Sequence, residues 1–73
     1  MFGLTEREVE RIKKAYPKGT RLVLISMDDS WTKLKHGDQG TVDFVDDAGQ
    51  IHMKWDNGSS LALIPGEDSF RMV

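Results

Sequence analysis

The sequence predicts a mainly β domain with one helix at its N-terminal end. Two observations predict the sheet: apolar and polar residues alternate through residues 37–58, and turn-forming residues interrupt this pattern twice. A helix-start pattern near the N-terminus, followed by Pro17, predicts the helix. The chain has 73 residues, a net charge of −2 and no cysteine, which is typical of one small domain without disulfides or thiolate metal sites.

The predicted helix begins after Thr5, a favoured N-cap residue. Glu8 lies three residues later and can complete a capping box. We expect the helix to run from residue 6 to residue 15 or 16, because Pro17 disfavours helical geometry in the residue before it. A helix of about ten residues is marginal alone, so we expect it to pack on the sheet or against another molecule.

The strand patterns indicate five short strands in all. They are residues 21–27, two strands within 37–58, residues 59–64, and a short closing strand at 71–73.

Alternation also predicts which side chains of the central hairpin are buried. Val42 and Phe44 are two residues apart, as are Ile51, Met53 and Trp55, so each set is expected to share the buried face of its strand.

Two registers are possible for the turn after Trp55, and burial of leucines decides between them. A two-residue turn would expose Leu61 and Leu63, whereas a three-residue loop with Gly58 in a left-handed bulge would bury both. Burying them is worth about 3–5 kcal/mol, so we predict the longer loop, with a negative φ at Asn57. The predicted pairs are Trp55 with Ser59, Met53 with Leu61, and Ile51 with Leu63.

The residues for catalysis are few, and we predict that the protein is not an enzyme. His36 and His52 are the two imidazoles; His52 falls on the polar side of a strand and His36 in a long connection. The paired carboxylates lie in separate turns, where aspartate usually binds its own backbone. We therefore expect no cofactor and no metal site.

A binding role is better supported by the eleven-residue connection at 28–38. Trp31 lies in this polar segment, where alternation does not require its burial, and tryptophan is enriched among interface anchors. We expect a protein or peptide partner to dock there; the alternative is that Trp31 is a lid residue that folds over the open end of a small barrel. The candidate contact residues are Trp31, Asp28, Asp29, Lys33, Lys35 and His36.

Nucleic-acid binding is the alternative function. The N-terminal helix and its exit carry Arg7, Arg11, Lys14 and Lys18, which could contact phosphates. The acidic net charge disfavours this alternative relative to a protein partner.

Membrane association is not expected. The longest apolar runs, at 22–25 and 61–64, are far shorter than a membrane span. The N-terminus lacks the features of a signal peptide, and we expect a cytoplasmic protein.

Several sequence blocks resemble the small bacterial family called domain of unknown function 4314. The blocks include Gly-Thr-Val at 40–42, Asp-Asp-Ala-Gly at 46–49 and Trp-Asp-Asn-Gly at 55–58, with further blocks at 17–21, 24–29 and 63–70. Residues 31–36 depart from the family pattern, which is richer in proline there. The resemblance brings no assigned activity and no site residues.

The resemblance implies a small SH3-like five-stranded barrel. Residues 40–58 are also similar to the Mib/Herc2 domain of ubiquitin ligases and, more weakly, to KOW modules, relatives that bind peptides or associate with RNA and ribosomes. We expect a single domain, with residues 1–16 packed as a helix on a barrel formed by residues 17–73.

Overall fold

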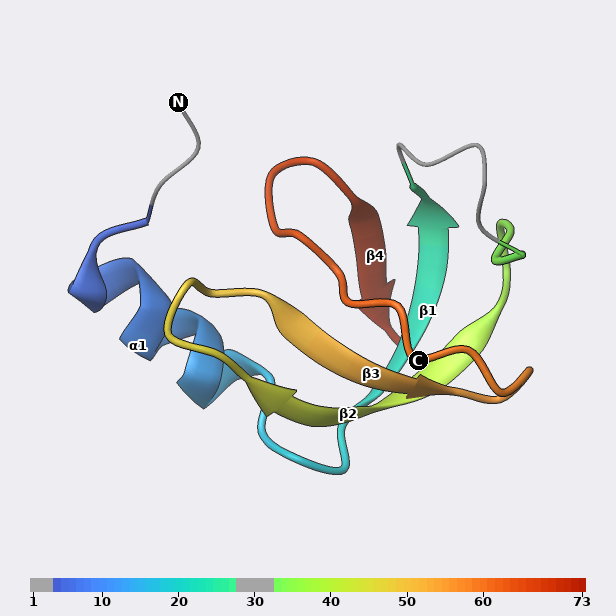
Figure 1. Ribbon diagram of the computed structural model, residues 1–73, viewed down its shortest axis with the longest axis horizontal. Coiled ribbons are helices and arrows are strands. Elements are labelled where there is room, and N and C mark those ends of the chain that lie inside the picture. The colour runs from blue at the N-terminus through green and yellow to red at the C-terminus, as the bar shows by residue number, and fades with distance from the viewer. Residues whose placement is uncertain (1–3, 28–32) are drawn as a thin grey trace.

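The computed structural model describes residues 4–27 and 33–73, which form one helix and four strands (Figure 1). The strands make one antiparallel sheet in the order β3-β2-β1-β4. In Figure 1, β1 and β4 stand side by side, β2 and β3 run across them, and the helix lies at the far end of the β2–β3 hairpin. The elements are α1 (Glu6–Ala15), β1 (Arg21–Ser26), β2 (Gln39–Val45), β3 (Ile51–Trp55) and β4 (Ser69–Met72).

The mainly β fold is confirmed, but the described residues form an open sheet and the predicted five-stranded barrel is not confirmed. The prediction of a regular strand at 59–64 is wrong. Ile51 and Leu63 exchange two backbone hydrogen bonds, of 2.9 and 2.8 Å, but they form an isolated bridge. Nearby, the carbonyl of Leu61 accepts a hydrogen bond from the Trp55 indole at 2.8 Å, so a side chain satisfies this carbonyl in place of a strand ladder.

The predicted turn after β3 is confirmed. Gly58 has a φ of +93°, and none of the described non-glycine residues has a positive φ, so φ at Asn57 is negative. The amide of Trp55 donates to the carbonyl of Ser59 at 3.0 Å, in the predicted register. Burial of Leu63, which is 0% exposed, explains why the longer loop is favoured over the two-residue turn.

The helix begins as predicted, with a complete capping box. The amide of Glu8 donates to the Thr5 hydroxyl at 3.2 Å, and the amide of Thr5 donates to the Glu8 carboxylate at 3.0 Å. The hydrogen bonds from Thr5 hold the pKa of Glu8 below its ordinary value. Local hydrogen bonds therefore define the start of α1 without help from the sheet.

One side of α1 packs on the sheet of the same chain. Val9 is buried, and Ile12 and Tyr16 pack against the core. Tyr16 also meets Phe70 of β4 edge to face, with ring centroids 5.5 Å apart. No described helix combines the length and apolar character needed to cross a bilayer.

The core lies between the curved sheet and the segment that follows β3. Leu34 enters it from the connection before β2 and is 7% exposed. The core residues are Leu22, Leu24, Leu34, Val42, Ile51, Met53, Trp55 and Leu63.

Candidate functional site

The structure describes only part of the binding site predicted in the 28–38 connection. Asp28, Asp29 and Trp31 lie outside the described residues. Lys33 and Lys35 are exposed.

His36, also predicted in that site, is held to the neighbouring strand. Its ring Nδ1 lies 2.9 Å from the carbonyl oxygen of Ile25, to which it donates a hydrogen bond. The amide of Gly37 donates to the carbonyl of Leu24 at 2.8 Å beside it. These bonds give His36 a structural role at the end of β1.

The basic residues predicted on the helix are brought together on its solvent side. Arg7, Arg11 and Lys14 are spaced by four and three residues, so they share one helix face, and all three are exposed. None of them forms an ion pair with a described residue at the 4 Å limit. Lys18, beyond the helix, lies 3.9 Å from the Asp43 carboxylate.

Phe44 is where the structure corrects the sequence analysis most. The prediction that it shares the buried face with Val42 is wrong: its side chain is 51% exposed. Val42 pairs with Met53 of β3 and Phe44 pairs with His52, so Asp43 is an extra residue in β2. This β-bulge reverses the alternation, and Val45 packs against the core instead.

The bulge places Phe44 directly on the ring of His52. The two rings are stacked, with centroids 4.2 Å apart and planes within 6°. His52 was predicted on the polar side of its strand, and it is half-buried there. The exposed aromatic ring therefore rests on a second ring that comes from the neighbouring strand.

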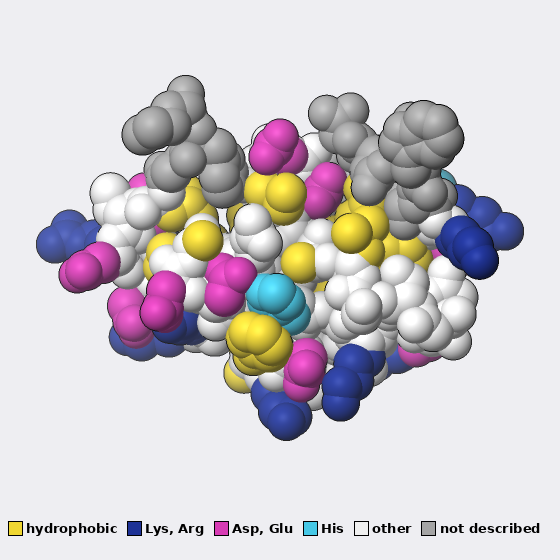
Figure 2. Space-filling model, in the orientation of Figure 1, with side chains coloured by type: hydrophobic (Ala, Val, Ile, Leu, Met, Phe, Trp, Pro, Cys, Tyr) yellow, Lys and Arg dark blue, Asp and Glu magenta, His cyan; other side chains and the backbone are white. Residues whose placement is uncertain are grey.

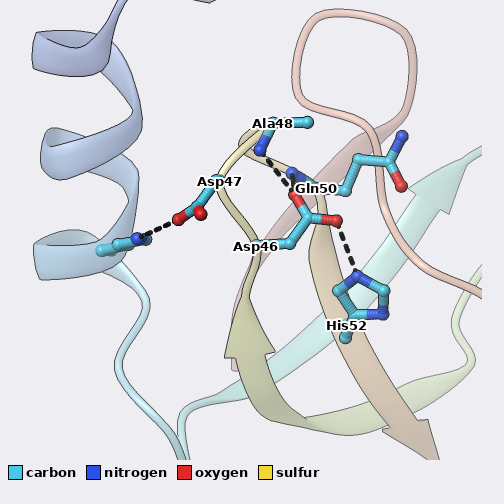
Figure 3. Close-up of polar contacts among 6 residues, drawn as sticks. Asp46, Asp47, Ala48, Gln50 and His52 are labelled. Carbon is cyan, nitrogen blue, oxygen red and sulfur yellow. Dashed lines mark hydrogen bonds and ion pairs between the residues drawn. The ribbon is translucent and has the colours of Figure 1, made fainter.

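Asp46 holds His52 in this position (Figure 3). Its Oδ2 lies 2.8 Å from Nε2 of His52, and its Oδ1 accepts hydrogen bonds from the amides of Ala48 at 3.0 Å and Gln50 at 2.9 Å. One carboxylate thus orders both the β2–β3 turn and the imidazole ring.

The charge state of Asp46 follows from these contacts. Partial burial raises the pKa of its carboxyl group, but the hydrogen bonds from His52, Gln50 and Ala48 outweigh that effect and hold the pKa below its ordinary value. The carboxylate is therefore charged at neutral pH and available to bind the ring.

We call Asp43, Phe44, Asp46 and His52 the outer patch. Figure 2 shows a histidine side chain against a hydrophobic one near the middle of this face, with acidic and basic side chains around them. Asp43 and Asp46 place two carboxylates in the patch, and Lys54, two residues along β3 from His52, is exposed. The arrangement offers an apolar ring surrounded by charge, which suits recognition of a side chain.

A hollow of about 360 Å³ lies between α1 and the β2–β3 turn. Lys13 and Asp47, which line this hollow, form an ion pair with Nζ and Oδ1 3.0 Å apart; Figure 3 shows the Asp47 side chain directed toward α1. Asp47 is fully exposed, so water screens the pair. The hollow is lined by Glu6, Val9, Glu10, Lys13 and Asp47, and it offers no aromatic surface. No group of three or more potential metal ligands gathers within the described ranges.

One sequence signal could have revealed the outer patch. Val42, Phe44 and Val45 cannot all lie on one face of a regular strand, so strict alternation fails at residues 44–45. Such a break marks a bulge, but it does not say which of the two apolar side chains turns outward. The position of Val45 over the core decides that.

Comparison with known proteins identifies the family. No curated protein matches the chain. The family model described as Domain of unknown function (DUF4314) matches residues 5–73. Because this match covers nearly the whole chain, the protein belongs to the DUF4314 family.

Proposed function

We propose that the protein is a non-enzymatic interaction module that binds a protein or peptide partner through the outer patch. The observation that carries this proposal is Phe44, which is half exposed, turned outward by a bulge and stacked on a histidine that a carboxylate holds in place. Isolated exposed apolar residues are common on protein surfaces. An exposed aromatic ring with its own supporting contacts is a better candidate for a binding anchor, because aromatic side chains dominate interface energetics.

Preorganisation supports the same proposal. The ring of Phe44 is supported by His52, and His52 is bonded to Asp46, which is itself bonded to two backbone amides. A surface that is already ordered loses little side-chain entropy when a partner binds.

The contacts of His52 also favour binding over catalysis. A histidine–aspartate pair needs a nucleophile within hydrogen-bond reach to act in covalent catalysis. Among the described residues, the ring of His52 bonds to Asp46 and to no hydroxyl group. We therefore propose a binding function for the protein and no enzymatic one.

Selection from a displayed random-peptide library tests the proposal. We expect selected peptides to bind the wild-type protein and to bind Phe44→Ser about tenfold or more weakly. Met72→Ser is the matched control, because Met72 of β4 is also 51% exposed and lies outside the outer patch. Peptides that bind both variants as tightly as the wild type would contradict the proposal.

Nucleic-acid binding is the second candidate function. It is favoured by Arg7, Arg11 and Lys14, which share the solvent side of α1 and form no ion pair among the described residues. Lys18 would extend this basic face beyond the helix.

Titration with DNA and RNA at two salt concentrations tests this second function. Three phosphate contacts give a slope of about −3 for log affinity against log salt on duplex DNA. Replacing Arg7, Arg11 and Lys14 together by glutamine should abolish that slope, whereas the control Lys33→Gln with Lys35→Gln should keep it. Binding that does not change with salt would reject this function.

The broader architecture and location belong to the same proposal. In Figure 1 the β2–β3 hairpin runs across β1 and β4, and this bend of the sheet, together with the Ile51–Leu63 bridge, supports a relationship to SH3-like barrels. We propose a cytoplasmic location because the sequence contains no cysteine and so needs no oxidising compartment for disulfides.

A further inference from the structure

We infer that the partner's recognition element is an arginine side chain, which stacks on Phe44 and pairs with Asp43. This inference rests on the proposed function and names the partner chemistry of the outer patch. Three features carry it: an open aromatic face, a carboxylate on the same side of the bulge, and a weakly held cation already beside that carboxylate.

The open aromatic face belongs to Phe44. The parallel stacking 4.2 Å from His52 covers one face of the phenyl ring, yet 51% of the residue remains exposed. The opposite face is therefore available to solvent. A guanidinium group is planar, delocalised and weakly hydrated, so it stacks well on such a face.

The carboxylate belongs to Asp43, the extra residue of the bulge. A bulge brings two consecutive side chains to the same side of a strand, and here these are Asp43 and Phe44. The Asp43 side chain is 30% exposed. An arginine that stacks on Phe44 can therefore direct its N–H groups at this carboxylate.

A cation of the chain itself already lies near Asp43. Nζ of Lys18 is 3.9 Å from Oδ1 of Asp43, and the lysine side chain is 79% exposed. An ion pair this long and this exposed is weak, so a partner's guanidinium can displace it. The position of Lys18 shows that Asp43 attracts a cation, and its weak ion pair leaves the carboxylate accessible to a partner's guanidinium.

The charge of the patch separates arginine from the other candidates. A nucleotide base could also stack on Phe44, but its phosphates would lie near Asp43 and Asp46, which repel them. A lysine ammonium can reach the carboxylate, but it has no planar surface for stacking. Arginine satisfies both the ring and the carboxylate, because its guanidinium is planar, always charged and rich in N–H donors.

An NMR titration with short synthetic peptides tests the inference directly. The probe is acetyl-Gly-Gly-Arg-Gly-Gly-amide, and its matched control carries citrulline, which has nearly the same shape and no charge. We expect the arginine peptide to shift the amide signals of Asp43, Phe44 and His52. The citrulline peptide should bind on the order of fivefold more weakly, since it loses the cation–π and ion-pair contributions.

Two variants separate the role of Asp43 from that of Lys18. Asp43→Asn and Lys18→Met both remove the ion pair between these residues; the Lys18 side chain is exposed and the Asp43 side chain is partly exposed. Asp43→Asn should weaken binding of the arginine peptide about fivefold. Lys18→Met should leave it unchanged or make it tighter, because it removes a competitor.

Equal binding of the arginine and citrulline peptides would overturn the inference, as would a loss of binding in Lys18→Met equal to that in Asp43→Asn. Signal shifts on α1 instead of the outer patch would also overturn it. A short oligothymidylate that shifts the Phe44 signals more than the arginine peptide does would overturn it in favour of base stacking. Library peptides that need Phe44 but contain no arginine would overturn this inference and leave the proposed function intact.

Discussion

The two faces of the β2–β3 hairpin are made by the same two strands and differ in almost every property. The inner face carries Val42, Ile51 and Met53, which are at most 2% exposed. The outer face carries the exposed Phe44 stacked on the half-buried His52, an aromatic pair that a carboxylate orders. Apolar burial holds the inner face, whereas directional contacts order the outer one.

One extra residue produces this difference. Before Asp43 the alternation places Val42 inside, and after it Phe44 lies outside and Val45 packs on the core. A bulge changes the face of the side chains that follow it and disrupts the ladder only locally. The comparison teaches that the outer patch depends on a local irregularity in a strand that is otherwise regular.

The largest expected effect lies on the inner face. Ile51→Ala should lower the free energy of unfolding by about 2–5 kcal/mol, because Ile51 is 0% exposed and its loss leaves a cavity. Urea denaturation followed by tryptophan fluorescence measures this change. A loss smaller than that of Phe44→Ala would contradict the division between the two faces.

The end of the hairpin should give the next largest effect. Gly49 has a φ of +86°, and an added Cβ would overlap the side chain of Leu4 next to α1. Gly49→Ala should therefore cost about 1–3 kcal/mol through backbone strain, with a smaller cost for the shift of the Leu4 side chain. Gly66→Ala is the matched control, since its φ is +93° with open space around it. Equal losses in the two variants would show that packing against Leu4 adds nothing.

A smaller effect is expected for Phe44→Ala on the outer face. Phe44 is half exposed, and the variant loses mainly its stacking on His52, so the expected cost is about 1 kcal/mol or less. The same denaturation experiment measures it. If Phe44→Ala lowered the free energy of unfolding more than Ile51→Ala does, the outer face would contribute to stability as much as the buried core.

The smallest effect on the free energy of unfolding at neutral pH is expected for Asp46→Asn, and this effect should depend on pH. The folded state lowers the pKa of Asp46 from its ordinary value of 3.8, so the charged carboxylate stabilises the fold above that pH. This contribution is lost as pH falls below 3.8 through the folded-state pKa. The difference in unfolding free energy between wild type and Asp46→Asn should therefore shrink on acidification.

Denaturation curves measured at neutral and at acidic pH test this expectation. Asp56→Asn provides a comparison, because its hydrogen bond to Arg21 also lowers the pKa of that carboxyl group. Asp56→Asn should also change how the free energy of unfolding depends on acidic pH, but it should not change the NMR signals of the His52 ring. If the difference in unfolding free energy between wild type and Asp46→Asn widened as pH falls, the folded state would raise the pKa of Asp46, which would contradict the prediction.

Sequence reasoning succeeded where a few neighbouring residues decide the structure. The capping box needs only Thr5 and Glu8, and the loop at Gly58 follows from the need to bury Leu63. It failed at residues 59–64, where apolar content predicted a strand. There the Trp55 indole donates a hydrogen bond to the carbonyl of Leu61, a side-chain contact that the alternation of apolar and polar residues does not encode.

The candidate site was harder to predict than the fold. Trp31 was chosen because its burial is not dictated by periodicity, and it lies outside the described residues. Phe44 was passed over because alternation assigned it to the core. Aromatic residues in regular patterns are usually buried, so only the pairing of β2 with β3 could show that this one is not.

The amino-acid sequence by itself determined the mainly β class, the start of α1, the turn after β3 and the family of the chain. These features depend on contacts between residues close in the chain, or on similarity over its whole length. The tertiary structure alone decided that the sheet stays open and that Phe44 faces solvent on His52. Both outcomes depend on the register between separate strands, which packing of the whole core selects from several alternatives that local preference leaves close in energy.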